Sequence, residues 1–254
     1  MKAPQISEIR EYWNNNIHDA GVATHPAGTP GYFKDLEAYR FSKLDYLPRL
    51  VNFSAYSGKR ILEVGCGVGI DLLRFAQAGA EVVGVDLSKV AIDLARRNFA
   101  LSRLQAELHV MDGEALEFTS ESFDVVYSHG VLQYTSEPAK MILEIYRVLR
   151  PGGEAILMVY NKFSWLNLLS FISRVELEHQ DAPALRKFSV GEFKRMLAPF
   201  SKVSVIPDRF PVKTQLHHGW KAALYNEVFV RSFNLLPRSW VQPFGWHLLA
   251  FAHK

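Results

Sequence analysis

The chain has 254 residues, 48% of them hydrophobic and 22% charged, with a formal net charge of +3. This length suits one α/β domain with additions, and the small net charge does not indicate a nucleic-acid-binding protein. No apolar run is as long as a membrane span, and the single cysteine, Cys66, excludes an intramolecular disulfide and a cysteine-rich metal site. The first residues lack the apolar core of a signal peptide, so we expect a cytoplasmic protein.

The N-terminal region, residues 1–59, is predicted to form a helical cap on the domain that follows. Apolar residues recur at helical spacing in two stretches, about 6–14 and 34–50. A loop rich in glycine, proline and threonine, residues 21–31, separates the two predicted helices.

Residues 60–160 alternate apolar strand-like runs with helical stretches, which predicts a parallel sheet covered on both faces. The expected strands are 60–64, 81–86, 106–111, 123–128 and 154–160. The expected helices between them are 71–78, 88–102 and 136–150, and the last is ended by Pro151-Gly152-Gly153.

The remainder of the chain is less regular. Residues 164–172 and 190–197 are typical of helices, and 202–206 alternates like a strand. Residues 246–252 form an apolar run that predicts a last buried strand. The segment between these two strands, 207–245, is longer than a tight hairpin connection and is interpreted as an insertion.

The most informative stretch is residues 61–69, where a strand-like apolar run ends in a glycine-rich loop that opens a helix. Glycines at alternate positions from Gly65 to Gly69 allow a tight turn without Cβ atoms, so a ligand can lie almost against the backbone. A dinucleotide-binding loop has the spacing G-x-G-x-x-G, which would require glycine where Ile70 stands. With Glu63 two residues before the first glycine, the pattern is instead E-x-G-x-G-x-G.

The ends of the next three expected strands carry small or polar residues. They are Asp86-Leu87, Asp112-Gly113 and Ser128-His129-Gly130. Because the carboxyl ends of parallel strands meet at one edge of a sheet, we expect these residues to lie beside the glycine loop.

These four strand ends resemble the cofactor motifs of class I S-adenosylmethionine (AdoMet) methyltransferases. Two further segments, Gly130–Tyr134 and Glu144–Gly153, are similar to those of the small-molecule type found in ubiquinone and menaquinone biosynthesis. The resemblance covers residues 60–160 well and 189–206 loosely. It implies a Rossmann-like, seven-stranded, mostly parallel sheet with helices on both faces and an antiparallel last strand.

The resemblance also implies AdoMet as cofactor and S-adenosylhomocysteine as product. In such a site Glu63 supports the cofactor's ammonium group, Asp86 accepts hydrogen bonds from both ribose hydroxyls and Leu87 packs on the adenine. Asp112 suits the exocyclic adenine amine, and a backbone carbonyl of the segment 128–130 takes the ammonium. The predicted cofactor-binding residues are Glu63, Gly65, Cys66, Gly67, Gly69, Asp86, Leu87, Asp112, Gly113, Ser128, His129 and Tyr12.

Several classes of methyl acceptor do not fit the residues after the fourth strand. An enzyme that methylates adenine or glutamine amino groups would show N/D-P-P-Y/F there, and a catechol enzyme would show magnesium-binding carboxylates. A protein-arginine enzyme would need paired glutamates, and an arsenite enzyme would need several cysteines. A small molecule attacked at oxygen, carbon, sulfur or nitrogen is left, and no metal site is predicted.

The catalytic candidates are His129 and Tyr134, and the wider set of acceptor-site candidates adds Tyr12, Trp13, His18 and Tyr32. His129 lies where a general base would be useful, although a histidine beside a strand end can equally be a hydrogen-bonded structural residue. Tyr12 and Trp13 could cover the cofactor or serve only in packing. His217-His218 is interpreted as a surface pair, because no cysteine or acidic cluster accompanies it.

The insertion 207–245 is predicted to act as a lid or to help form the acceptor region. In helical projection one face is apolar, with Leu224, Tyr225, Val228, Phe229, Phe233 and Leu236. Residues 209–254 carry six basic residues against one acid, together with three of the five tryptophans. The insertion could therefore pack on the domain, close over the acceptor or contact a membrane surface, and we expect a lipophilic or aromatic acceptor.

Two rival functions are left open beside a methyltransferase. A catalytically silent module that binds AdoMet or S-adenosylhomocysteine is compatible with the lack of an evident base. A nicotinamide-dependent oxidoreductase is disfavoured by Ile70. The sequence does not define the oligomeric state.

Overall fold

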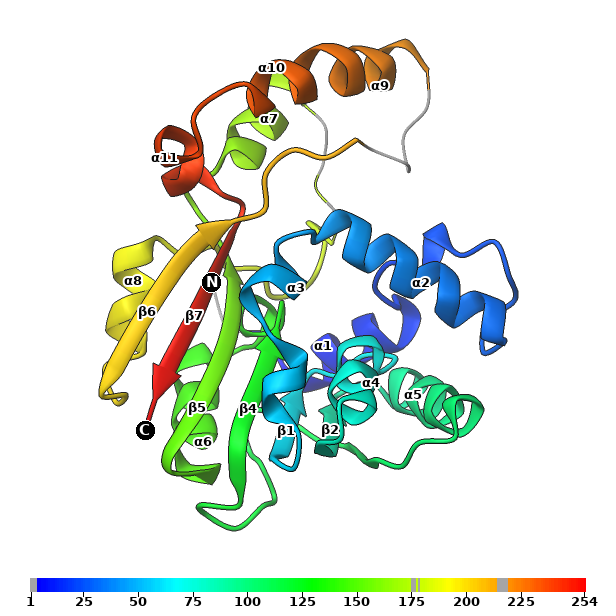
Figure 1. Ribbon diagram of the computed structural model, residues 1–254, viewed down its shortest axis with the longest axis vertical. Helices are drawn as coiled ribbons and strands as arrows, with labels where there is room; N and C mark the ends of the chain where they lie inside the picture. The colour runs from blue at the N-terminus through cyan, green and yellow to red at the C-terminus, as the bar shows by residue number, and fades with distance from the viewer. Residues whose placement is uncertain (1–3, 175–176, 178, 214–218) are drawn as a thin grey trace.

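A seven-stranded sheet with the order β3-β2-β1-β4-β5-β7-β6 forms the centre of the molecule (Figure 1). The computed structural model describes residues 4–174, 177, 179–213 and 219–254. All neighbouring strands pair in parallel except β7, which is antiparallel to both β5 and β6. The predicted sheet, including its antiparallel last strand, is confirmed.

The strands begin and end close to their predicted bounds, with one exception. They are β1 Arg60–Val64, β2 Glu81–Asp86, β3 Glu107–Val110, β4 Phe123–His129, β5 Leu149–Tyr160, β6 Lys202–Asp208 and β7 His247–His253. The predicted start of β5 at residue 154 is wrong, because the strand already begins at Leu149. Its pairing with β4 is irregular at this end, where a Cβ atom on Gly153 would lie 2.9 Å from the carbonyl oxygens of Arg150 and Asp124. Glycine is therefore needed for the close approach of the two strands, and it does not end the strand.

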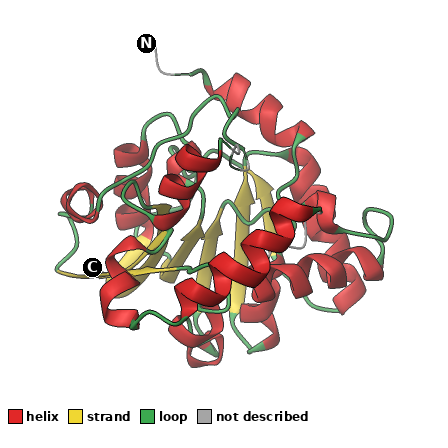
Figure 2. Cartoon of the chain, turned by 90° about the horizontal axis from the view of Figure 1, so that it is seen from above, coloured by secondary structure: helices red, strands yellow, loops and turns green. Residues whose placement is uncertain are grey.

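Helices cover both faces of the sheet, as Figure 2 shows from above. The helices of this core are α4 Ile70–Gln77, α5 Lys89–Ser102, α6 Pro138–Val148 and α8 Val190–Met196. The apolar side chains of α4 and α5 pack against one face, and those of α6 and α8 pack against the other. Side chains of successive strand residues point to opposite faces, so the nearly continuous apolar strands supply both layers.

The N-terminal region contains three helices instead of the two predicted. They are α1 Ile6–Asn15, α2 Pro30–Lys43 and α3 Leu47–Leu50. The predicted helix 34–50 is wrong at its start, because the Thr29 hydroxyl caps α2 by accepting from the Tyr32 amide and proline occupies the first turn. It is also interrupted, since Pro48 has no amide hydrogen to continue the ladder. The break buries Tyr46 completely against the sheet.

The remaining helices gather beyond the start of β7, where α7, α9, α10 and α11 lie together (Figure 1). Their bounds are α7 Trp165–Ser173, α9 Trp220–Leu224, a π-helical turn Tyr225–Phe229, α10 Val230–Asn234 and α11 Arg238–Val241. Short 3₁₀ turns occur at Ala20–Val22, Phe53–Tyr56, Leu132–Tyr134 and Gln242–Phe244. None of the helices in the described part of the chain is both long and apolar enough to span a bilayer.

The predicted apolar face of the insertion is divided between packing and solvent. Phe229 and Phe233 lie beside Trp165 of α7, with ring centroids 6.1 and 6.0 Å away. Leu224 and Val228 are exposed. The π-helical turn changes the angular spacing of the side chains, so a face projected at 3.6 residues per turn does not stay on one side.

Candidate functional site

A cavity opens at the carboxyl edge of the sheet, where the ends of β1, β2, β3 and β4 meet the N-terminal region. Its lining includes the glycine loop, the residues after β2 and β3, parts of α1 and α2, and two residues beside β7. Of the predicted cofactor residues, the lining contains Glu63, Gly65, Cys66, Gly67, Asp86, Leu87, Asp112, Gly113 and His129. Residues from four strand ends therefore face one space.

The glycine loop has a backbone conformation that L-residues with side chains rarely adopt. Gly65, Gly67 and Gly69 have φ values of +75°, +53° and +78°. A Cβ atom on Gly65 would lie 2.2 Å from Cγ2 of Val131, whereas one on Gly67 would meet nothing within 4 Å. The loop thus packs tightly behind Gly65 and leaves open space at Gly67, so a ligand can approach the backbone there.

Asp86 joins the glycine loop to the segment after β2. One carboxylate oxygen accepts from the Gly67 amide at 2.9 Å, and the other accepts from the Ser88 amide at 2.8 Å. Burial raises the pKa of Asp86, against the effect of these hydrogen bonds. The carboxylate keeps lone pairs free toward the cavity, which suits hydroxyl donors of a ligand.

Glu63 contributes a buried carboxyl oxygen that has no hydrogen-bond partner among the described residues. Its side chain is 3% exposed, and Oε2 is the atom without a partner. Burial and the negative charge of Asp71 raise the pKa of Glu63, while Arg40 opposes the shift. An unpaired buried acceptor is costly, so this position favours a ligand that brings a donor or a positive charge.

Arg40 of α2 and Asp71 of α4 form a buried ion pair that the sequence did not predict. Arg40 Nε donates to Asp71 Oδ1 at 2.5 Å, its Nη2 atom donates to Oδ2, and the Tyr127 hydroxyl donates to Oδ2 at 2.7 Å. Burial alone would raise the pKa of Asp71, but the charge and hydrogen bonds of Arg40 hold it below its ordinary value. Arg40 also lines the cavity, which places a positive charge beside the glycine loop. No short motif marks this residue, because its partner is 31 positions away.

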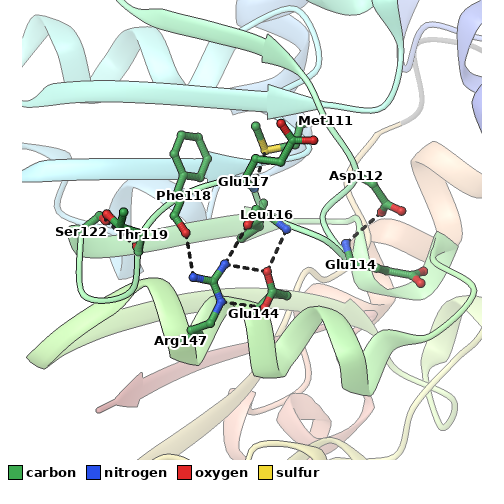
Figure 3. Close-up of polar contacts among 10 residues, drawn as sticks. All are labelled: Met111, Asp112, Glu114, Leu116, Glu117, Phe118, Thr119, Ser122, Glu144 and Arg147. Atoms are coloured by element: carbon green, nitrogen blue, oxygen red, sulfur yellow. Dashed lines mark hydrogen bonds and ion pairs between the residues drawn. The ribbon is translucent and has the colours of Figure 1, made fainter.

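The loop that carries Asp112 is fastened to α6 by Arg147 and Glu144 (Figure 3). Arg147 donates to the carbonyl oxygens of Leu116 and Phe118, each at 2.7 Å, and Glu144 accepts from the Leu116 amide at 2.8 Å. Arg147 and Glu144 also bond each other, with nitrogen–oxygen distances of 2.8 Å. Two residues of the Glu144–Gly153 segment thus fix the path of the loop after β3.

Three predicted cofactor residues lie outside the lining. The Ser128 hydroxyl is buried and donates to the Val64 carbonyl, and Gly69 is the N-cap residue of α4. The Tyr12 hydroxyl donates to Asp181 at 2.8 Å and lies 3.1 Å from Nδ1 of His179. Trp13, next to Tyr12, does line the cavity.

Aromatic rings form one wall of the cavity. Trp13 contacts Tyr134 edge-on at 5.0 Å between ring centroids, and Tyr134 contacts Tyr160 at 5.9 Å. All three residues line the cavity. We call this set the aromatic wall. Tyr134 is thus brought to the site as predicted, and Tyr160 at the end of β5 is a residue that the sequence did not single out.

His129 belongs to a hydrogen-bonded row at the same edge. The Tyr46 hydroxyl lies 2.8 Å from Nε2 of His129 and 2.6 Å from Nδ1 of His247, and Arg209 Nη1 lies 2.9 Å from Nε2 of His247. Burial, followed by the positive charge of Arg40, lowers the pKa of His129 well below its usual value. Burial and Arg209 do the same for His247. Both rings are therefore neutral near pH 7.

The other acceptor-site candidates lie in different parts of the structure. His18 lines the cavity and pairs with His179 at 3.0 Å. Tyr32 is instead buried in a small apolar cluster with Val68 and Ile70. The pair His217-His218 lies outside the described residues.

The sequence was compared with protein families and with known proteins. Residues 62–157 match the methyltransferase domain family. The chain is 31% identical over 154 residues to a ubiquinone biosynthesis O-methyltransferase of Alkalilimnicola ehrlichii, covering 58% of this chain and 62% of that protein. It is 32% identical over 137 residues to the enzyme of the same name from Aromatoleum aromaticum, covering 53% of this chain and 56% of that protein. The match thus spans less than two thirds of either relative.

A solved structure extends the likeness in fold to nearly the whole chain. Magnesium protoporphyrin IX methyltransferase from Synechocystis PCC 6803, determined with bound S-adenosylhomocysteine, has a TM-score of 0.63 at 16% identity. The comparison covers 98% of this chain and 100% of that chain. At this identity the likeness concerns the fold alone. Within this fold, residues 62–157 are the part of the chain that matches the methyltransferase domain family.

Proposed function

We propose that this protein transfers a methyl group from AdoMet to a small-molecule acceptor. The observation that carries the proposal is the convergence of the glycine loop, the unpartnered Glu63 oxygen and Asp86 on one cavity. When bound, AdoMet supplies a methyl group on a positively charged sulfur. An open loop backbone and a buried carboxyl oxygen fit the cationic amino-acid part of such a ligand.

The chain's own residues would divide the work of binding. Glu63 faces the ammonium group of the cofactor, and Asp86 accepts from its ribose hydroxyls. Asp112, held by the loop fastened to α6, is available for the adenine amine. Arg40 supports this arrangement, because a guanidinium beside the glycine loop can balance the carboxylate of the amino-acid part. These roles rest on the position of each group around the cavity.

An aromatic or lipophilic acceptor attacked at oxygen is the class that we favour. The aromatic wall of Trp13, Tyr134 and Tyr160 offers ring faces and edges to a planar partner. The relatives named above are O-methyltransferases, which supports an oxygen nucleophile. Rate enhancement would come mainly from holding the acceptor oxygen and the methyl carbon in line at near-contact distance.

We also propose that the group of helices α7, α9, α10 and α11 contacts a membrane surface. Several large apolar side chains in or next to α7, α9, α10 and α11 are exposed, and Phe171 and Leu235 are 84% and 85% exposed. The others are Phe163, Leu168, Ile172, Trp220, Leu224, Val228, Leu236, Trp240 and Phe244. Basic residues Lys213, Arg231 and Arg238 accompany them. Aromatic and aliphatic groups next to positive charge are the combination expected at an anionic interface.

Calorimetric titration with S-adenosylhomocysteine tests the cofactor site directly. We expect saturable one-to-one binding, and no binding at millimolar ligand would reject the proposal. A methyl-transfer assay with labelled AdoMet and a panel of phenols and carboxylic acids then separates an enzyme from a silent module. Binding without transfer to any acceptor would favour the module.

A further inference from the structure

The acceptor side of the cavity contains an arginine whose guanidinium pairs with no acid among the described residues. Arg209 follows β6 and lines the cavity, and among the described residues the only side-chain partner of its guanidinium is the neutral ring of His247. Its neighbour Asp208 is engaged instead by Arg49, at 2.8 Å. An arginine left without an acid in a cavity wall is a site for an incoming anion.

The backbone around Arg209 is strained and firmly held. Its φ is +63°, a left-handed conformation that costs energy in a residue with a side chain. The Arg209 carbonyl accepts from the Trp165 indole at 2.9 Å and from the Trp246 amide at 3.1 Å. Gly245 makes room for this turn, since a Cβ atom there would lie 2.4 Å from the Asp208 carbonyl oxygen. These contacts fix the position of the guanidinium.

The hydrogen-bonded row that begins at Arg209 has only one consistent direction. A guanidinium can only donate, so Nε2 of His247 accepts and its neutral ring carries the proton on Nδ1. That proton is donated to the Tyr46 oxygen, and the Tyr46 hydroxyl proton is donated to Nε2 of His129. Neutral His129 therefore carries its own proton on Nδ1, an atom with no partner among the described residues. The row presents N–H donors to the cavity at both ends.

The titratable side chains that line the cavity near Arg209 are engaged by partners among the described residues. His129 and His247 each use their basic nitrogen within the row. Asp19 is bound to Lys43 at 2.5 Å, and His18 pairs with His179. An alcohol or phenol acceptor would have to break one of these bonds to lose its proton. A carboxylic acid needs no base, because it is already ionised at neutral pH.

We propose that the acceptor is a carboxylic acid, held as its carboxylate by Arg209 with His129 as a second donor, and that the reaction forms a methyl ester. This inference rests on the proposed function. One carboxylate oxygen forms the new O–C bond while the S–C bond breaks and its electron pair stays on sulfur. The negative carboxylate and the positive sulfonium become a neutral ester and a neutral thioether, and no proton is displaced. Opposite charges attract more strongly in a partly enclosed cavity than in bulk water.

The experiment compares a carboxylate with an uncharged molecule of the same shape. The full chain, saturated with S-adenosylhomocysteine, is titrated calorimetrically with 4-octyloxybenzoate and with 4-octyloxybenzamide. We expect the acid to bind at least tenfold more tightly than the amide. In the Arg209→Gln variant the two affinities should become equal within about threefold, and Arg209→Lys should keep part of the preference because it retains charge without the planar fork.

Arg231→Gln is the matched control, because it removes the same charge from an exposed position of the same insertion. It should keep the wild-type ratio of acid to amide affinity. With AdoMet in place of the product, the benzoate should gain one methyl group as a base-labile ester, detected by mass. Equal wild-type affinities, binding of neither probe, or a preference that survives Arg209→Gln would overturn the inference.

The titration with S-adenosylhomocysteine alone keeps the two proposals distinguishable. Cofactor binding without any preference for the carboxylate would overturn only the assignment of the acceptor. If the wild-type chain does not bind S-adenosylhomocysteine, the proposed function itself is rejected. Unchanged S-adenosylhomocysteine affinity in Arg209→Gln would show that the variant is folded. If that variant does not fold, the inference is tested by the ratio of acid to amide affinity in the wild type and in Arg209→Lys.

Discussion

The Tyr46 hydroxyl lies 2.8 Å from Nε2 of His129, which ties the break between α2 and α3 to the carboxyl end of β4. Tyr46 is completely buried, and its hydroxyl also meets Nδ1 of His247 at 2.6 Å. One oxygen therefore links the N-terminal region to two strands of the sheet. Burial raises the pKa of Tyr46 above its ordinary value, so the hydroxyl keeps its proton.

Replacing Tyr46 by phenylalanine should destabilise the fold without opening a cavity. The change leaves two buried ring nitrogens without their partner, and we expect the free energy of unfolding to fall by about 1–3 kcal/mol. Urea denaturation followed by tryptophan fluorescence measures the loss. Tyr146→Phe is the control, because that hydroxyl has no hydrogen bond to the described residues and its ring contacts Phe200 edge-on. Equal losses in the two variants would contradict the role given to Tyr46.

Stability should decline as the pH falls below about 6.5, because His129 and His247 are held neutral in the folded protein. Burial lowers the pKa of both rings, so protons bind the unfolded chain preferentially. The stabilisation is complete above the unfolded pKa and is lost on acidification, by up to about 1.4 kcal/mol per pH unit for each ring. Urea titrations at pH 7.5, 6.0 and 5.0 measure this slope.

A variant comparison assigns the slope to the buried rings. His247→Gln should flatten the dependence, whereas replacing the exposed His109 by glutamine should leave it unchanged. A pH dependence that is as steep in His247→Gln as in wild type would contradict the buried, neutral state of His247.

Arg147→Ala should loosen the loop that carries Asp112. The variant loses two hydrogen bonds to loop carbonyls and the partner of Glu144. We expect the free energy of unfolding to fall by about 1–3 kcal/mol and S-adenosylhomocysteine to bind more weakly. Arg150→Ala is the control, since Arg150 pairs with Asp124 at the opposite end of β4, and should change stability by less than about 1 kcal/mol. If Arg147→Ala binds S-adenosylhomocysteine as tightly as wild type, the loop does not contribute to the cofactor site.

The sequence predicted the parts of the molecule that depend on local pattern. Alternating strands and helices defined the sheet, and the glycine spacing placed Gly65 and Gly67 in the cavity lining. It could not predict residues whose role depends on distant partners. Arg40 meets Asp71 from 31 positions away, and Tyr46 meets His247 from 201 positions away. Such pairs leave no mark in spacing or periodicity.

Some helix boundaries were predicted wrongly because the apolar period alone was followed. Residues 34–50 have apolar spacing compatible with one helix, yet Pro48 interrupts the hydrogen-bond ladder and Tyr46 turns into the core. In the insertion, the π-helical turn changes which side chains share a face. The first departure follows from a proline within the apolar period, and the second from a local change in helical pitch.

Asp86→Asn should weaken the binding of S-adenosylhomocysteine by roughly tenfold or more, because a hydrogen bond to a charged acceptor contributes about 1.5–3 kcal/mol. Asparagine keeps the size of the side chain but exchanges one acceptor oxygen for a donor. Asp93→Asn on the exposed side of α5 is the control, where the carboxylate pairs with Lys89 and Arg96. Calorimetry on both variants gives the comparison. Equal affinities in wild type and Asp86→Asn would show that Asp86 does not bind the cofactor.

The exposed apolar side chains of α7 and α11 should carry contact with anionic lipid. Phe171 and Trp240 are 84% and 72% exposed, and each can bury an aromatic ring at the interface. We expect wild-type protein to float with vesicles that contain anionic lipid and the double variant Phe171→Ser, Trp240→Ser to lose roughly tenfold or more of this binding. Leu143→Ser on α6, also an exposed apolar position, should float like wild type. Because the basic residues add an electrostatic attraction, high salt should weaken wild-type binding. Wild-type protein that stays unbound, or a double variant that floats equally well, would show that this surface has another role.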